Sequence, residues 1–280
     1  MKLALITGQG DIPRLIAEHR RDAGEPPFII ALKGFEGDWI RNFEHEVSGL
    51  AEFGKTFKTL RAQGCDTISF IGNVKRPDFS KLKPDLKGMS LLPKMVAAAR
   101  KGDDALLRAI VKAFEDEGFA VVGAHDLLND LSQTAGRLNT VSIDDTALDD
   151  IALAYEVAGE IGRLDIGQGC VVCNGLVLAV EAQEGTDEML KRVGKLPENI
   201  RGSESDRKGV LLKRPKPIQE QRVDMPTLGP STVRLADDAG LKVIAAIEGG
   251  ALWVELEEMR RLADAAGIAL VSLSKEGRLL

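Results

Sequence analysis

Short apolar runs alternate with helical patterns through the first half of the chain. Four of these runs have the length of a buried strand, and a glycine follows each within two residues: Leu3–Ile6, Phe28–Leu32, Thr67–Ile71 and Phe119–Val122. Between them, apolar residues recur every three or four positions, as a helix requires, most clearly over 90–100 and 104–117. Buried strands that alternate with helices are typical of a parallel sheet with right-handed crossovers. We therefore predict a Rossmann-like N-terminal domain over residues 1–135.

The second half has a different pattern. A helical spacing at Ile151–Ile161 is followed by strand-like runs that crowd together: Gly169–Cys173, Leu176–Glu181, Val210–Leu212, Val243–Ile247 and Leu252–Val254. The pairs Asn174-Gly175 and Gly249-Gly250 stand between neighbouring runs and indicate hairpins. We predict a mixed α+β domain over 136–280, so the expected fold class is α/β, with a parallel N-terminal sheet and a C-terminal α+β domain.

Length and charge narrow the class of protein. A chain of 280 residues is about twice the size of a common single domain, which favours two domains. Its net charge of −6 argues against a nucleic-acid partner, because nucleic-acid-binding faces usually make a domain basic. No apolar run approaches the roughly 18 residues that cross a bilayer. Three cysteines cannot form a disulfide framework, so we expect a cytoplasmic protein.

Two of the cysteines, Cys170 and Cys173, have the spacing of half a metal-binding motif. They lie in an apolar strand, where residues three apart point to opposite faces, and no second pair or histidine cluster follows. We expect buried structural thiols rather than metal ligands.

A glycine-rich turn follows the first apolar run and begins the first helical pattern. It reads Gly8-Gln-Gly10-Asp11-Ile-Pro13, the setting of a nucleotide-binding turn. The third glycine of a dinucleotide motif is replaced by Pro13, and Lys33 stands where an acidic residue would hold the ribose. We expect the turn to bind the phosphates of a single nucleotide. The alternative is a tight turn without a ligand.

Acidic residues crowd the loop after the run that ends at Glu181. Helix capping by Thr186, with Asp187 in the first turn, explains part of this loop. It does not explain Glu181 and Glu184, whose neighbouring negative charges suit a hard cation such as Mg²⁺.

Basic residues gather just before an isolated aspartate. From Arg207 to Arg222 there are six basic residues and one acidic residue, and Asp224 follows among prolines, a glycine and a threonine. Such a composition indicates a loop. A carboxylate beside several cations suits a site that handles an anionic substrate through a metal ion; the alternative is a solvated charged loop.

A second basic segment extends from Val74 to Lys101. Eight basic residues outnumber two acidic ones and accompany the apolar residues Leu91, Leu92 and Met95. Cations beside apolar side chains can lie at a membrane surface or bind the phosphate of an amphiphile. An ordinary solvated loop and helix is the alternative.

Several motifs together resemble the LpxI family of UDP-2,3-diacylglucosamine pyrophosphatases of lipid A biosynthesis. They run in order from the first residues to about Thr232 and are Gly8-Gln-Gly10-xx-Pro13, Phe70-Ile71-Gly72-Asn73, Lys101-Gly-Asp-Asp104-Ala-Leu-Leu-Arg108, Leu164-Asp165-Ile-Gly-Gln168, Val177-Leu-Ala-Val-Glu181-Ala-x-Glu184-Gly-Thr-Asp187 and Lys216-Pro-x-Gln219-xx-Arg222-Val-Asp224-x-Pro226-Thr227.

The resemblance implies a Mg²⁺-dependent hydrolase that splits UDP-2,3-diacylglucosamine into UMP and 2,3-diacylglucosamine 1-phosphate, with water directed at the phosphorus on the sugar side. It also implies that the substrate is held between the two domains. Asp224 becomes the first catalytic candidate, and the sequence leaves open whether it binds the metal or orients the water. Glu184 and Asp187 are the other catalytic candidates, and Glu181 is a second metal ligand.

Substrate-binding candidates come from both predicted domains. Lys213, Lys216 and Arg222 would neutralise the pyrophosphate as charge develops. The others are Gly10, Asp11, Gly72, Asn73, Lys75, Gly123, Thr186, Gln219 and Thr227. The two acyl tails need shielding from water, since each buried CH₂ contributes about 0.8 kcal/mol. We expect an apolar cleft between the domains.

Two other functions stay open at this point. A carrier would bind the nucleotide lipid without hydrolysing it, and a nucleotide-sugar oxidoreductase would use the Rossmann-like half. The expected partners are UDP-2,3-diacylglucosamine and, transiently, the surface of the inner membrane, where the protein would be peripheral. The sequence leaves the oligomeric state open between a monomer and a homodimer.

Overall fold

The computed structural model describes residues 2–75, 77–127, 133–217, 220, 222–223 and 225–280. The chain divides into two compact units. The first comprises residues 1–128 together with 220–224, and the second comprises 129–219 and 225–280. A short segment far along the sequence, 220–224, thus belongs to the first unit.

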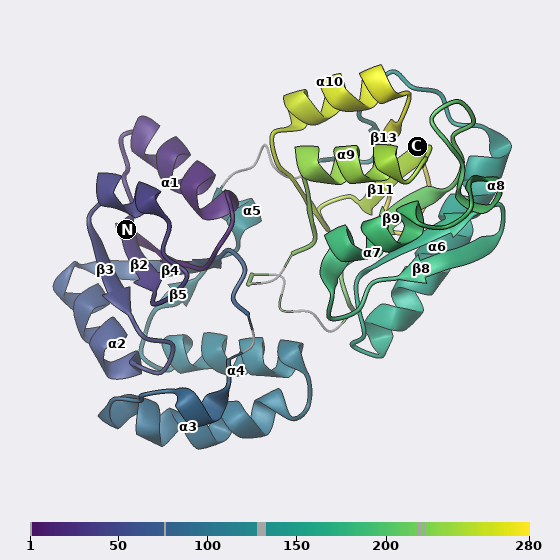
Figure 1. Cartoon of the computed structure of the whole chain (residues 1–280). Helices are drawn as coiled ribbons and strands as arrows, with labels where there is room; N and C mark the ends of the chain where they lie inside the picture. The colour runs from purple at the N-terminus through teal and green to yellow at the C-terminus, as the bar shows by residue number, and fades with distance from the viewer. Residues whose placement is uncertain (1, 76, 128–132, 218–219, 221, 224) are drawn as a thin grey trace. The chain divides into compact units, whose positions relative to one another are not determined.

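The first unit is built on a fully parallel sheet in the order β3-β2-β1-β4-β5 (Figure 1). Its strands are β1 (Lys2–Thr7), β2 (Phe28–Leu32), β3 (His45–Ser48), β4 (Cys65–Ile71) and β5 (Ala120–Val121). The helices are α1 (Ile12–Asp22), α2 (Phe53–Ala62), α3 (Leu86–Ala99), α4 (Asp103–Glu115) and α5 (Ala124–Leu127), with 3₁₀ turns at Asp38–Asn42 and Phe79–Lys81. The predicted parallel sheet with helices is confirmed.

The strand order of this sheet reverses between β1 and β4. Chain segments run outward from β1 to β3 on one side and from β4 to β5 on the other. In open α/β sheets, ligands bind outside the carboxyl ends of the strands at such a switch point. The residues after Thr7 and Ile71 therefore hold the position where a ligand is expected.

Aromatic side chains fill the core under one face of this sheet. Phe57 and Phe114 meet edge to face with ring centroids 4.9 Å apart, and Phe70 and Phe114 do so at 5.1 Å. Phe53 and Phe119 complete the group. Offset and edge-to-face aromatic pairs contribute stability beyond the area they bury. This cluster connects α2 and α4 to β4.

The second unit contains a mixed six-stranded sheet in the order β6-β13-β11-β9-β7-β8. Its strands are β6 (Gly136–Arg137), β7 (Gly169–Cys173), β8 (Leu176–Val180), β9 (Val210–Lys213), β11 (Val243–Ile247) and β13 (Ala269–Leu273). β9, β11 and β13 are parallel, whereas β6, β7 and β8 pair antiparallel. The mixed α/β character predicted for this half is confirmed.

Helices cover both faces of the second sheet. They are α6 (Asp145–Arg163), α7 (Gly185–Gly194), α8 (Glu198–Arg201), α9 (Pro230–Asp238) and α10 (Leu256–Ala266). One hydrophobic cluster joins α6 to one face of the strands, and another joins α7, α9 and α10 to the opposite face. Strands buried on both faces need apolar residues at successive positions, which explains runs such as Val243–Ile247.

One of the two predicted hairpins forms. At Asn174-Gly175 both residues have positive φ, and β7 and β8 pair antiparallel. The hairpin predicted at Gly249-Gly250 is wrong, because the strand after it, β12 (Leu252–Trp253), pairs in parallel with β10 (Thr227–Leu228) and not with β11. Gly249, with a φ of 64°, does form a turn, but the strand that follows it pairs with β10.

The returning segment is anchored to α4 by polar contacts. The backbone N–H of Glu220 donates to Asp104 Oδ1 at 2.7 Å. The Arg222 guanidinium donates to both carboxylate oxygens of Glu220 at 2.8 Å and to Glu115 at 2.7 Å. Val223 packs against the hydrophobic core of the first unit. These contacts fix the residues on either side of position 221 to the first unit.

Acid is expected to weaken this anchoring. Hydrogen bonds from Arg222 hold the pKa of Glu220 below its usual value of 4.5. Because the folded-state pKa is depressed, the stabilisation is complete above the unfolded-state pKa and is lost as the pH falls through the folded-state pKa. The melting temperature should therefore fall more steeply in wild type than in Glu220→Gln below about pH 5. Glu156→Gln, at an exposed site, should behave as wild type. Equal pH dependence in wild type and Glu220→Gln would show that the pair does not anchor the segment.

No helix among the described residues is long and apolar enough to span a bilayer.

Candidate functional site

The loops after β1 and β4 bind to each other. Gly8 N–H donates to the Ile71 carbonyl at 2.8 Å, and the backbones of Gln9 and Asn73 exchange hydrogen bonds of 2.9 and 2.8 Å. A Cβ on Gly8 would lie 2.5 Å from the Asn73 oxygen, and one on Gly72, whose φ is +95°, would lie 2.7 Å from the Gln9 oxygen. These two glycines are therefore needed for the close approach of the loops.

This pairing limits what the glycine-rich turn can offer an anion. The N–H groups of Gly8, Gln9 and Asn73 are engaged within the loops. Those of Gly10 and Asp11 make no backbone hydrogen bond within the described part of the chain, and both residues are exposed. Gly10 has a φ of +110° and open space where a Cβ would stand. Within the described turn, the backbone N–H groups that could bind an anion are therefore those of Gly10 and Asp11, next to the start of α1.

The other candidates at this edge differ in exposure. Asn73 and Lys75 are exposed beside the paired loops. Gly123 is buried after β5, and its N–H donates to Asp126 Oδ2 at 2.9 Å. A Cβ there would lie 2.4 Å from the ring of His125.

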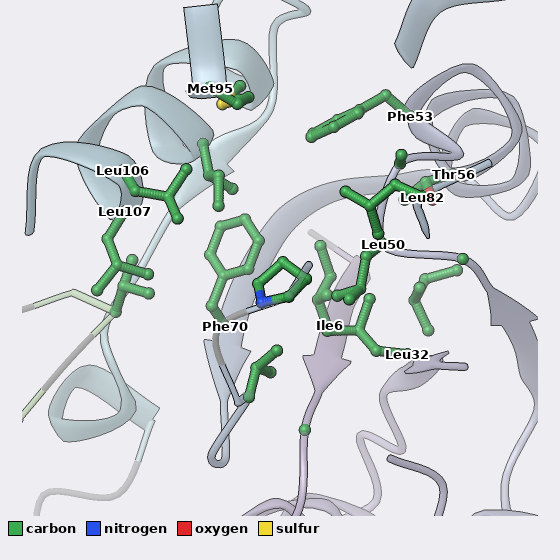
Figure 2. Close-up of a pocket in the computed structure, with 18 of the residues that line it drawn as sticks. Ile6, Leu32, Leu50, Phe53, Thr56, Phe70, Leu82, Met95, Leu106 and Leu107 are labelled. Carbon is green, nitrogen blue, oxygen red and sulfur yellow. The ribbon is translucent and has the colours of Figure 1, made fainter. Parts of the chain in front are cut away.

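An apolar cavity of about 380 Å³ opens at the switch point (Figure 2). Figure 2 shows Phe70 with Leu106 and Leu107 of α4 on one side and Ile6 and Leu50 on the other. Gly8, Ile71 and Gly72 also line the cavity, so it adjoins the paired loops. Every lining residue belongs to the first unit. Ligand pockets in proteins commonly have volumes of roughly 300–1,000 Å³, which includes this cavity.

A chain of polar groups, two of them buried and one half-buried, connects the ends of β8 and β9 with β10 in the second unit. Glu181 follows β8 and Lys213 ends β9; the two residues are 6% and 4% exposed. The Thr186 hydroxyl donates to Glu181 Oε1 at 2.8 Å and accepts from Lys213 Nζ at 2.7 Å. Lys213 Nζ also lies 3.5 Å from the carbonyl oxygen of Thr227. We call Glu181, Thr186 and Lys213 the buried relay.

Glycines make room for the buried relay. Glu181 N–H donates to the Gly169 carbonyl at 2.8 Å, and Gly169 pairs with Lys213 across β7 and β9. A Cβ on Gly169 would lie 2.8 Å from Glu181 Oε2, and one on Gly167 would lie 2.0 Å from the Glu181 carbonyl oxygen. Side chains at these two positions would displace Glu181. The motif that begins at Leu164 therefore has a steric function that its sequence alone does not reveal.

One oxygen of the buried relay has no partner. Glu181 Oε2 is buried and accepts no hydrogen bond within the described residues. Leaving a buried carboxylate oxygen unpaired is costly, so such groups usually have a partner or a function. An unpaired carboxylate oxygen is a ligand of the type that Mg²⁺ prefers. The described residues contain no cluster of three or more acidic, histidine or cysteine side chains that could hold a metal ion by itself.

The predicted capping by Thr186 is wrong. Helix α7 begins at Gly185, and Glu184 stands at the N-cap position without a side-chain cap. Thr186 lies inside the first turn, and Glu181 and Lys213 both engage its hydroxyl. Tertiary contacts of the hydroxyl replace the local capping bond that the sequence suggests.

The acidic residues of this loop do not converge. Glu184 is exposed and accepts a hydrogen bond from Arg192 at 2.7 Å, while Asp187 is exposed in the first turn of α7. Of these three acidic residues, only Glu181 accepts a hydrogen bond from Thr186 and so belongs to the buried relay.

The basic residues after β9 have separate partners. Lys216 Nζ donates to Asp165 Oδ1 at 2.6 Å, in a pair that is largely shielded from solvent. Arg214 lies 3.8 Å from the centroid of the Tyr155 ring and donates to the Tyr155 carbonyl at 2.8 Å. The Thr227 hydroxyl donates to the Met225 carbonyl at 3.3 Å. The contacts with Asp165 and Tyr155 could not be predicted from the sequence, because both partners lie on or beside α6, more than 50 positions before Arg214 and Lys216.

The three remaining candidates belong to the stretch between β9 and β10. Arg222 is held by Glu220 and Glu115 in the first unit, and these hydrogen bonds raise the pKa of its guanidinium. Asp224 and Gln219 lie outside the described residues.

The cysteines are buried packing residues, as predicted. Cys170 and Cys173 are fully buried on β7, and burial raises the pKa of the two thiols to about 12 and about 11. Iodoacetamide should therefore label them at pH 8 at least about a hundredfold more slowly in the folded protein than in urea, since the thiolate is the nucleophile. Mass spectrometry of the labelled peptides measures the two rates. Rapid labelling of the folded protein would contradict the buried assignment.

Comparisons with known proteins match the same family along nearly the whole chain. Family models described as the LpxI N-terminal domain and the LpxI C-terminal domain match residues 2–131 and 134–271. A curated relative from Caulobacter vibrioides, named UDP-2,3-diacylglucosamine pyrophosphatase LpxI, is 50% identical over 277 residues, which cover 99% of each chain. Among solved structures, CobK precorrin-6A reductase matches 98% of this chain and 88% of its own at 10% identity, with a TM-score of 0.32 that is too low to indicate a shared fold. This chain belongs to the LpxI family.

Proposed function

We propose that this protein is a hydrolase of lipid A biosynthesis that cleaves the pyrophosphate of UDP-2,3-diacylglucosamine. The products would be UMP and 2,3-diacylglucosamine 1-phosphate. The observation that carries this proposal is the 50% identity, over essentially the whole length, with a relative that is named for this pyrophosphatase activity. An apolar cavity beside the candidate phosphate-binding turn, and buried polar groups after β8 and β9, are consistent with a substrate that is both lipid and anion.

Cationic and hydroxyl groups would bind the diphosphate. Lys213 holds the Thr186 hydroxyl, so the two act as one unit. Lys216 and Arg222 are held by carboxylates, and a diphosphate would have to compete with Asp165, Glu115 and Glu220 for them. Once they engage the diphosphate, these cations would stabilise the negative charge that develops in the transition state. The uridine and its phosphate would lie near Gly10 and Asp11.

Glu181 and Asp224 would hold a Mg²⁺ ion. The unpaired Oε2 of Glu181 fits such an ion, because Mg²⁺ is commonly bound by one or two carboxylates and completes its shell with water and substrate phosphates. The ion would neutralise phosphate charge and polarise the phosphoryl oxygens. Asp224 would either share in binding the ion or orient the attacking water. Glu184 and Asp187, which are exposed, would position water or the ion only from outside the buried relay.

The cavity in the first unit would shield an acyl chain. Leu107→Trp places a larger side chain into the lining of the cavity. It should raise the KM for the diacylated substrate about fifteenfold, which corresponds to losing the burial of about two methylene groups at about 0.8 kcal/mol each. The kcat should be unchanged. Leu148→Trp, at a 40% exposed site on α6, is the matched control. An unchanged KM in Leu107→Trp would show that acyl chains bind elsewhere.

The reaction is tested by incubating the protein with UDP-2,3-diacylglucosamine in ¹⁸O-labelled water, with Mg²⁺ or with EDTA. Phosphorus NMR should show UMP and a sugar phosphate, with the label in the sugar phosphate and no product in EDTA. Formation of UDP would mean cleavage of the glycosyl bond and contradict the proposal. Label in UMP would place the attack on the other phosphorus, and turnover in EDTA would refute the Mg²⁺ requirement.

A further inference from the structure

Helix α3 presents apolar side chains to solvent. Leu86 is 83% exposed and Met89 is 52% exposed, and Pro93 and Ala97 are also exposed. The spacing of these residues places them on one face of the helix. The opposite face packs Met95 into the core of the first unit. A helix in a soluble domain normally carries polar residues on its outer face, so this outer face is unusual.

The exposed face is hollowed into a groove. Met89, Leu92, Pro93, Val96, Ala97 and Arg100 line an open depression of about 480 Å³. Figure 1 shows α3 packed beside α4 at one end of the first unit. We call the residues 86, 89, 93 and 97, together with this groove, the α3 face.

Cations border the α3 face. Lys83, Lys94, Arg100 and Lys101 are exposed and form no salt bridge within the part of the chain that the structure describes. Lys81 and Lys87 are also exposed, although they pair with Asp78 and Glu117. The segment 74–101 carries eight basic and two acidic residues in a chain whose net charge is −6. Basic residues around an apolar helix face match the anionic headgroups and acyl boundary of a lipid surface.

The groove and the internal cavity share a wall. Leu92 lines both, and Met95, on the next turn of α3, lines the cavity (Figure 2). Leu82, just before α3, lines the cavity as well. Leu92 thus contributes apolar surface both to the outer groove and to the cavity inside the first unit.

We propose that the α3 face docks on an anionic membrane surface, which brings the wall that the groove shares with the cavity close to the acyl chains of the bilayer. The lysines and Arg100 contact phosphate headgroups, and Leu86 and Met89 enter the acyl boundary. The role of the cavity in receiving the lipid rests on the function proposed above, but membrane binding by α3 does not depend on it.

Vesicle co-sedimentation tests the docking. The wild-type protein should bind vesicles of phosphatidylethanolamine and phosphatidylglycerol, and bind vesicles of phosphatidylcholine alone much less. Lys83→Gln/Lys94→Gln should weaken partitioning about thirtyfold at low salt, because each basic residue near an anionic surface contributes about 1 kcal/mol. Leu86→Ser/Met89→Ser should weaken it about tenfold at any salt concentration.

Matched variants show whether a loss of vesicle binding is specific to the α3 face or follows from any loss of surface charge or apolar surface. Lys33→Gln/Lys58→Gln removes the same charge from other exposed positions of the first unit, and Leu176→Ser/Val177→Ser removes similar exposed apolar surface from the second. Both controls should bind like wild type. Melting temperatures show whether each variant is folded.

The outcomes distinguish this proposal from the proposed reaction. The α3 variants should hydrolyse substrate dispersed in detergent like wild type and lose activity only on substrate in vesicles. Equal vesicle binding by wild type and both folded α3 variants would overturn the proposal. A wild-type dimer that Leu86→Ser/Met89→Ser converts to a monomer, with vesicle binding unchanged, would assign the α3 face to a second copy of the chain. Vesicle binding without release of UMP would refute the reaction and leave the docking surface standing.

Discussion

Replacing Asp224 by asparagine is expected to slow UMP release about a thousandfold, the range lost when a group that moves a proton or binds a catalytic metal is removed. Binding of the lipid nucleotide should persist, because the cations and the apolar cavity are unchanged. Turnover is followed by phosphorus NMR and binding by calorimetry on the same sample.

Asp149→Asn is the matched control, since Asp149 is exposed on α6 and away from the proposed machinery. It should leave both turnover and binding unchanged. A carrier that binds the nucleotide lipid without hydrolysing it would show no turnover in the wild type. Full activity in Asp224→Asn would show that this carboxylate is not needed for catalysis.

Replacing Lys213 by methionine is expected to lower the free energy of unfolding by about 3 kcal/mol, because removal of one buried charge leaves its buried neighbour uncompensated. Here the neighbour is Glu181, which Lys213 reaches through the Thr186 hydroxyl. The same variant should lose most of its activity, because both Thr186 and a cation for the diphosphate are affected. Urea denaturation measures the stability.

The double variant Glu181→Gln/Lys213→Met should recover part of the lost stability, since it removes the unpaired charge. Lys195→Met changes an exposed lysine next to α7 and should alter stability by less than about 0.5 kcal/mol. If the double variant is no more stable than Lys213→Met, the buried relay is not an electrostatic unit. A stable but inactive Lys213→Met would instead place the lysine solely in substrate binding.

Much of the first unit follows from local pattern. Runs such as Phe28–Leu32 are apolar at every position because both faces of a parallel strand are covered, so the sequence marks them clearly. Strand β3, His45–Ser48, was not predicted, because a polar edge strand lacks that signal. Helix α9 and strand β13 were also not predicted.

The site depends more on tertiary contacts. The sequence singled out Glu181, Thr186 and Lys213 separately, but assigned the threonine to a helix cap. Thr186 and Lys213 are 27 positions apart. They meet because β8 and β9 both pair antiparallel with β7, so the two strands end at the same edge of the sheet. In the same way, Lys216 and Asp165 are 51 positions apart.

The apolar cavity shows the same dependence. A need for apolar volume could be inferred from a lipid substrate, and a cleft between the domains was expected. The cavity described here lies within the first unit, where α4 and the loop before α2 leave space beside Phe70. Its volume is set by how these side chains pack, which no local pattern records.

By itself, the sequence determined the α/β class, the parallel sheet and the motifs that mark the family, because these depend on burial, turns and residue identity at short range. Only the tertiary structure decided which polar groups share the buried relay, why Gly8 and Gly72 must lack side chains, and where the apolar cavity lies. The physical reason is that hydrogen bonds, close backbone approach and cavity volume all depend on distances between residues remote in the chain, which folding alone sets.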